Sequence, residues 1–158
     1  ALRFSVLSGL GGFGLAASFL SSSRLVGGAA TAMVLGHWYL VVKDLSFAPL
    51  SRVTLVLMAA LVLRVAAIAL AACAQGGRWE ALVANGDWTG FFLGHGVFLM
   101  ARGIFGIIAP AFLLWMTWKC VQIRSNQSAT GILYVILAFV VIGEIIAKYF
   151  LVSEGLVI

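Results

Sequence analysis

Two long apolar runs with few charges, residues 52–74 and 129–152, constrain the fold most strongly. A hydrocarbon core about 30 Å thick is crossed by about 20 apolar residues of α-helix, and each run exceeds that length. Charged side chains make up only 9% of the 158 residues, against about a quarter in soluble globular domains. So little polar surface cannot cover a soluble domain, and the apolar content excludes a disordered chain. The sequence therefore predicts an integral membrane protein.

Three further apolar runs, at 4–20, 25–43 and 90–118, complete the predicted set of crossings. A polar break, Ser21-Ser22-Ser23-Arg24, separates the first two and is taken as a loop. We therefore predict an all-α fold: a polytopic transmembrane helix bundle with five membrane-spanning helices. Residues 1–158 are treated as a single integral membrane domain.

The distribution of basic residues predicts the orientation. With five crossings, the N-terminus and the loops at 44–51 and 119–128 share one side. That side and its flanking helix ends carry Arg3, Lys43, Arg52, Lys119 and Arg124, against one acid, Asp44. Because basic loops remain cytoplasmic, we expect a cytoplasmic N-terminus and an outside C-terminus, in a membrane such as the bacterial inner membrane.

Four charged residues fall inside the apolar runs: Arg64, Arg102, Glu144 and Lys148. Charges in hydrocarbon cost at least a few kcal/mol each, so each needs a partner or a pathway. We predict a buried ion-pair network, which on the simplest interpretation locks the bundle. Three cations against one carboxylate leave a positive surplus, however. An anionic group of a cofactor, a lipid or a partner subunit would balance it.

The two histidines, His37 and His95, are the candidate ligands for haem iron. Each follows a glycine, Gly36 or Gly94, which leaves room for a planar macrocycle beside the helix. Glycines at these positions equally suit close helix packing around structural histidines. The estimated depths of the two imidazoles differ by roughly 14 Å, so two separate sites fit better than one shared haem.

In composition the chain resembles the small cytochrome b-type anchor subunits of respiratory complexes, with few spans, short loops and one or two histidines near arginines. The resemblance implies a membrane subunit of an electron-transfer or energy-converting complex that binds haem b or contacts quinone. His95 and His37 would bind the cofactor, and Arg102 and Arg64 would meet propionates or other acids. The expected partners are other membrane subunits, lipid, and quinone or a cytochrome.

Two other functions stay open. One is a cofactor-free structural or assembly subunit of a larger membrane complex, and the other is a small transporter or channel. The sequence contains no HExxH, P-loop or GxSxG motif, which favours a non-catalytic or electron-transfer subunit over an autonomous enzyme. The ten basic residues form no stripe of the kind that binds nucleic acid.

Overall fold

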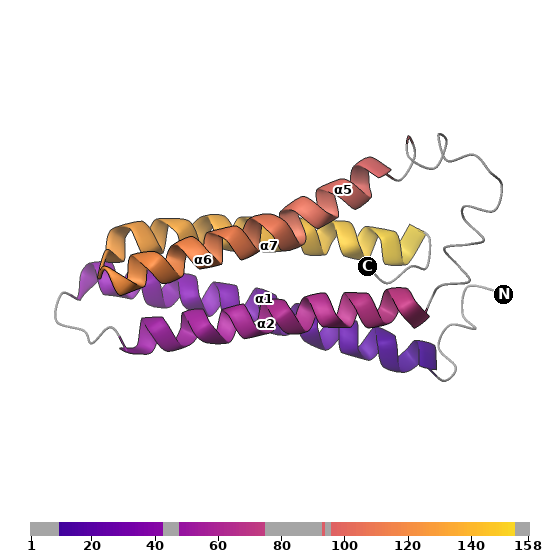
Figure 1. Ribbon diagram of the computed structural model, residues 1–158, viewed down its shortest axis with the longest axis horizontal. Helices are drawn as coiled ribbons and strands as arrows, with labels where there is room; N and C mark the ends of the chain where they lie inside the picture. Colours follow the sequence, from indigo (N-terminus) through magenta and orange to yellow (C-terminus); the bar gives the residue numbers. More distant parts are fainter. Residues whose placement is uncertain (1–9, 43–47, 75–92, 94–95, 154–158) are drawn as a thin grey trace.

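A computed structural model of the protein describes residues 10–42, 48–74, 93 and 96–153. Helices form every long element of this part of the chain (Figure 1). They are α1 (Leu10–Val41), α2 (Ala48–Ala74), α5 (Val97–Gly103), η3 (Ile104–Ile108), α6 (Ala109–Gln122) and α7 (Asn126–Ser153). Since α5, η3 and α6 follow one another without a break, the described residues form four long helical rods.

The four rods lie side by side along the length of the molecule (Figure 1). α1 packs against α2 and α7, and α6 packs against the same two helices. The short turn between α6 and α7 lies at one end of the bundle. The Leu10 end of α1 and the Ser153 end of α7 both lie at the other end.

Three of the rods are long and apolar enough to cross a membrane: Ala48–Cys73, Val97–Gln122 and Asn126–Ser153. Their outward faces are strongly apolar; Leu70 and Ile145, for example, are 72% and 64% exposed. A lipid environment accommodates such a surface, whereas water does not. These features support the predicted all-helical integral membrane protein.

The fourth rod, α1, differs from the prediction. It joins the described parts of the predicted spans 4–20 and 25–43 in one helix, with residues 21–24 near its middle. The serine hydroxyls do not end the helix, because they donate to carbonyls of the preceding turn: Ser21 Oγ to Ser18 O and Ser23 Oγ to Phe19 O, both at 2.9 Å. The count of five helices is therefore not confirmed. The inferred cytoplasmic N-terminus with an outside C-terminus depended on that count.

Small residues bring α1 close to its neighbours. The Gly36 carbonyl accepts a hydrogen bond of 2.9 Å from Thr130 Oγ1 of α7. A Cβ at Gly36 would lie 3.1 Å from the same oxygen, and one at Gly28 would lie 3.2 Å from Leu57 Cδ1 of α2. Ala29 and neighbouring buried side chains fill the rest of this seam. Such close approach of backbones is how membrane helices gain packing energy.

The third rod contains a π-helical turn at η3. The Ala109 N–H donates to the Ile104 carbonyl, five residues earlier. Pro110 follows directly and has no N–H to donate to the Gly106 carbonyl, so the widened turn sacrifices no α-helical hydrogen bond there. Beyond this turn, α5 leans away from the axis of the bundle (Figure 1).

The arrangement predicts which helix ends share a side of the membrane. In a cysteine-free background, Leu10→Cys and Ser153→Cys should react with an impermeant maleimide added from the same side of sealed vesicles. Ser125→Cys should react only from the opposite side. Five crossings, the first at 4–20, would instead bury position 10 within the membrane and leave it unreactive from both sides; that labelling pattern would contradict the four-rod bundle.

Candidate functional site

The carboxylate of Glu144, on α7, is the centre of a buried charged cluster. Its Oε1 lies 3.0 Å from Arg64 Nη2 and 3.7 Å from Arg102 Nη2. Its Oε2 accepts a hydrogen bond of 2.5 Å from Ser22 Oγ and lies 3.7 Å from Lys148 Nζ. The structure thus brings together all four charged residues that the sequence places inside the spans, and it adds a serine of α1.

Arg64 is fully buried and is held mainly by serines. Its Nη1 donates to Ser18 O at 2.9 Å, to Ser18 Oγ at 2.8 Å and to Ser21 Oγ at 3.2 Å. Its Nη2 donates to Glu144 Oε2 at 3.2 Å. The serines interpreted as a loop in the sequence therefore solvate a buried arginine. Their spacing carried a signal that sequence reasoning missed, because positions 18, 21 and 22 lie on one face of a helix.

Arg102 reaches the cluster through a notch made by two glycines. A Cβ at Gly106 would lie 1.6 Å from Arg102 Nη1, and a Cβ at Gly143 would lie 2.5 Å from the Gly106 Cα. Arg102 is only 4% exposed, yet its Nε and Nη2 have no hydrogen-bond partner among the described residues. The 3.7 Å separation from Glu144 is an ion pair without a hydrogen bond. Arg102 is therefore the least satisfied member of the cluster.

Lys148 lies at the periphery of the cluster. It follows Glu144 by one helical turn, and its side chain is 35% exposed. The ammonium also lies 4.0 Å from the centre of the Phe19 ring, a cation–π geometry that ties α7 to α1. The cluster as a whole holds three cations and one carboxylate, so its formal charge is positive.

This arrangement can fix the register of four helical elements, and it can attract an anion. Removing one member of a buried charged group leaves the others uncompensated, so the cluster strongly penalises alternative packings. It offers no second carboxylate for acid–base chemistry. Within the described residues, no group of three histidine, cysteine or acidic side chains could hold a metal ion.

His37, the one histidine candidate among the described residues, lies at a different level of the bundle from the charged cluster. His37 is exposed near the Val41 end of α1, and its Nδ1 lies 3.4 Å from Tyr134 Oη. Ser22, which contacts Glu144, precedes His37 along α1 by about 22 Å. The structure therefore does not bring Arg64 and Arg102 together with His37. The space provided by Gly36 is filled by α7 side chains. His95 lies outside the described residues.

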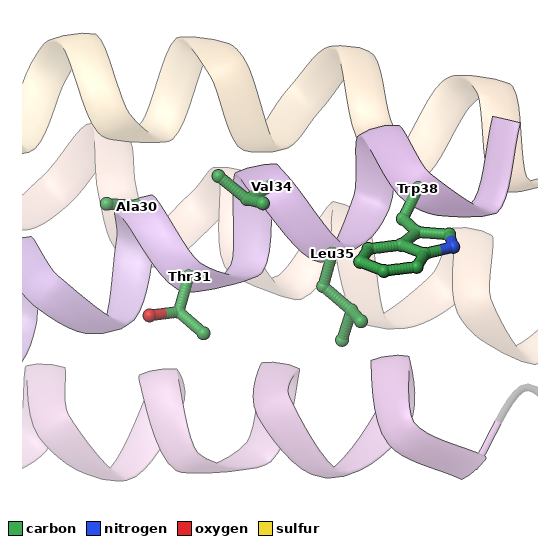
Figure 2. Close-up of a pocket in the computed structure, with 5 residues that line it drawn as sticks. All are labelled: Ala30, Thr31, Val34, Leu35 and Trp38. Atoms are coloured by element: carbon green, nitrogen blue, oxygen red, sulfur yellow. The ribbon is translucent and has the colours of Figure 1, made fainter. Parts of the chain in front are cut away.

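A shallow groove runs along α1 as far as Trp38, the residue that follows His37 in the sequence (Figure 2). It is lined by Ala30, Thr31, Val34, Leu35 and Trp38 and has a volume of about 380 Å³. Thr31 is the only lining residue with a polar side chain besides the Trp38 indole, and its hydroxyl donates to Gly27 O at 2.8 Å. The groove therefore suits an apolar occupant.

No protein-family model, curated protein sequence or solved structure matches the chain.

The geometry of the cluster predicts that Glu144 is coupled energetically to both Arg64 and Arg102, but not equally. Glu144→Gln should lower the free energy of unfolding by roughly 1–3 kcal/mol, because it strands buried cations. Combining it with Arg102→Leu should recover part of that loss. The coupling energy of Glu144 with Arg64 should exceed its coupling with Arg102, because only Arg64 is hydrogen-bonded to the carboxylate. Double-mutant cycles on unfolding in bicelles measure both coupling energies. Strictly additive losses in the free energy of unfolding would show that the residues share no network.

The glycine notch predicts that shortening Arg102 restores stability to one glycine variant and not to the other. Gly106→Ala and Gly143→Ala should each destabilise the bundle by roughly 1–3 kcal/mol through overpacking. Arg102→Leu should restore the Gly106 variant, whose new methyl meets the tip of the arginine. It should not restore the Gly143 variant, whose methyl meets the backbone of η3. The same unfolding assay distinguishes the two variants. Equal rescue of both would show that the new methyl groups overlap with other atoms than those named here.

Proposed function

We propose that the chain is a structural or assembly subunit of a larger membrane complex, in which another protein covers α1. The observation that carries this proposal is a polar stretch on the outer face of α1, where Ser23, Arg24 and Thr31 are exposed. α1 packs along α2 and α7, both long and apolar enough to cross a membrane. Such a polar stretch at that depth is costly to expose to lipid.

The contacts of α1 support its place at membrane depth. Ser22 meets Glu144, which is about 14 Å from the Ser153 end of α7. Gly28 meets Leu57, which is about 14 Å from the Ala48 end of α2. The middle of α1 is thus level with the interior of two apolar helices. Ser23, Arg24, Gly27 and Thr31 are exposed there.

The proposal includes an orientation. Arg52 of α2, Lys119 of α6 and Arg124 of the following turn all lie at the end of the bundle opposite Leu10 and Ser153. The positive-inside rule makes that basic end cytoplasmic. The Leu10 and Ser153 ends then both face outward, in a membrane such as the bacterial inner membrane.

An electron-transfer function is the second candidate, and the exposed His37 favours it. If Nδ1 donates its proton to Tyr134 Oη, Nε2 becomes a free acceptor that could ligate haem b or contact a quinone headgroup. The neighbouring groove could receive an apolar tail (Figure 2).

Purification of the tagged chain from native membranes in lipid nanodiscs tests both candidates. A subunit should elute in an assembly several times its own 16.7 kDa mass, with other membrane proteins in fixed stoichiometry. A chain that is monomeric in native nanodiscs would refute the subunit proposal. A b-type absorption spectrum that His37→Ala abolishes would support the second candidate, and an assembly without that spectrum would leave the structural function alone.

A further inference from the structure

We propose that Arg24 binds the carboxylate of a transmembrane helix from a different protein, which packs along the outer face of α1. This outer face consists of Arg24, Gly27, Thr31, Val34 and Trp38. The inference rests on the proposed function and names the chemistry of the partner. The five positions recur at three- and four-residue spacing, so they lie along one side of the helix.

Arg24 lies too deep to be a boundary residue. It is about 21 Å from the Leu10 end of α1 and about 26 Å from the Val41 end. Along α1 it falls between the Ser22–Glu144 contact and the Gly28–Leu57 contact. Both contacts lie well inside candidate spans. A guanidinium at that level and on the outside of the bundle faces hydrocarbon unless a protein covers it.

The guanidinium of Arg24 also lacks a partner among the described residues. Neither an ion pair nor a hydrogen bond joins it to any described residue. Its neighbours on α1 differ in this respect, because the hydroxyls of Ser23 and Thr31 donate to carbonyls of their own helix. Arg24 is thus the one exposed polar group on this stretch of α1 that requires a counter-charge from outside the described bundle.

The surface beside Arg24 has the shape of a helix-packing site. A Cβ at Gly27 would meet nothing within 4 Å, so another backbone can approach there closely. Ser23, Gly27 and Thr31 recur every four residues, the small-residue spacing that membrane helices use for close packing. The groove from Ala30 to Trp38 continues the same face and would receive larger apolar side chains (Figure 2).

Charge complementarity identifies the occupant. A second copy of the chain does not fit, because Glu144 is the only acid within its apolar runs and is already bound by Arg64 and Ser22. A symmetric dimer through Gly27 would also bring two Arg24 side chains together. A lipid phosphate lies at the headgroup level, far from the middle of α1. A foreign helix with one aspartate or glutamate at the depth of Arg24 satisfies both charge and shape.

A synthetic transmembrane helix provides a defined probe. The host is a leucine–alanine helix with a small-residue stripe and one aspartate at the depth of Arg24, and a matched peptide carries leucine instead. Energy transfer between labelled peptide and the full chain in phosphatidylcholine vesicles measures association. The aspartate peptide should bind about tenfold more tightly than the leucine peptide. Arg24→Leu should abolish that preference, and Arg24→Lys should retain most of it.

Two glycine variants test the shape of the site. Gly27→Leu should weaken binding of the aspartate peptide, because it blocks close approach. Gly131→Leu is the matched control: Gly131 is also an exposed helical glycine with nothing within 4 Å of its Cβ, but it lies on α7. It should leave binding unchanged.

Three results would overturn the inference: equal binding of the two peptides, a preference that survives Arg24→Leu, or self-association of the chain through this face. Each leaves the purification test of the subunit proposal unaffected. A monomeric chain in native nanodiscs would refute that proposal without altering the peptide result, so the two failures are distinguishable.

Discussion

The carboxylate of Glu144 is the interaction on which the bundle depends. It contacts side chains from α1, α2 and α5, and Lys148 of its own helix. Burying an ion costs several kcal/mol even after relaxation, and only well-placed partners offset that cost. Packing of apolar helices in lipid is weakly directional, since the lipid tails are as apolar as the side chains. The charged cluster therefore supplies specificity that apolar contacts alone do not.

The small residues around the cluster are as necessary as the charges. Ser18, Ser21 and Ser22 provide oxygen atoms where no water is available, and they do so without interrupting α1. Gly106 and Gly143 leave the volume in which the Arg102 guanidinium lies. Among the described residues, buried charged side chains occur only at this level of the bundle, while its surface is mostly apolar. Arg24 departs from that distribution, and for this reason it indicates a partner rather than a packing role.

Much of the fold could be predicted from the sequence, because long apolar runs have few alternatives. The predicted runs 52–74 and 129–152 correspond closely to α2 and α7. The charged members of the cluster were identifiable because each is conspicuous within an apolar run. The Ser21–Arg24 segment was misinterpreted because serine and arginine resemble a loop when their partners on other helices are unknown. The glycine notch depends on the register between helices, which no local pattern specifies.

The π-helical turn at Ile104–Ile108 has a consequence for how this protein tolerates changes in length. A π turn contains one residue more than an α turn, and each residue rotates a helix by about 100°. Deleting a single residue there would restore α-helical hydrogen bonding and leave α5 facing nearly the same direction, because the extra residue is absorbed within the turn. If the same residues formed α-helical hydrogen bonds without a deletion, α5 would instead rotate by roughly that angle about its axis. The guanidinium of Arg102 would then point away from Glu144, although every side chain of the cluster remained in the chain. The widened turn between Arg102 and Pro110 is thus as much a part of the charged cluster as the side chains that form it.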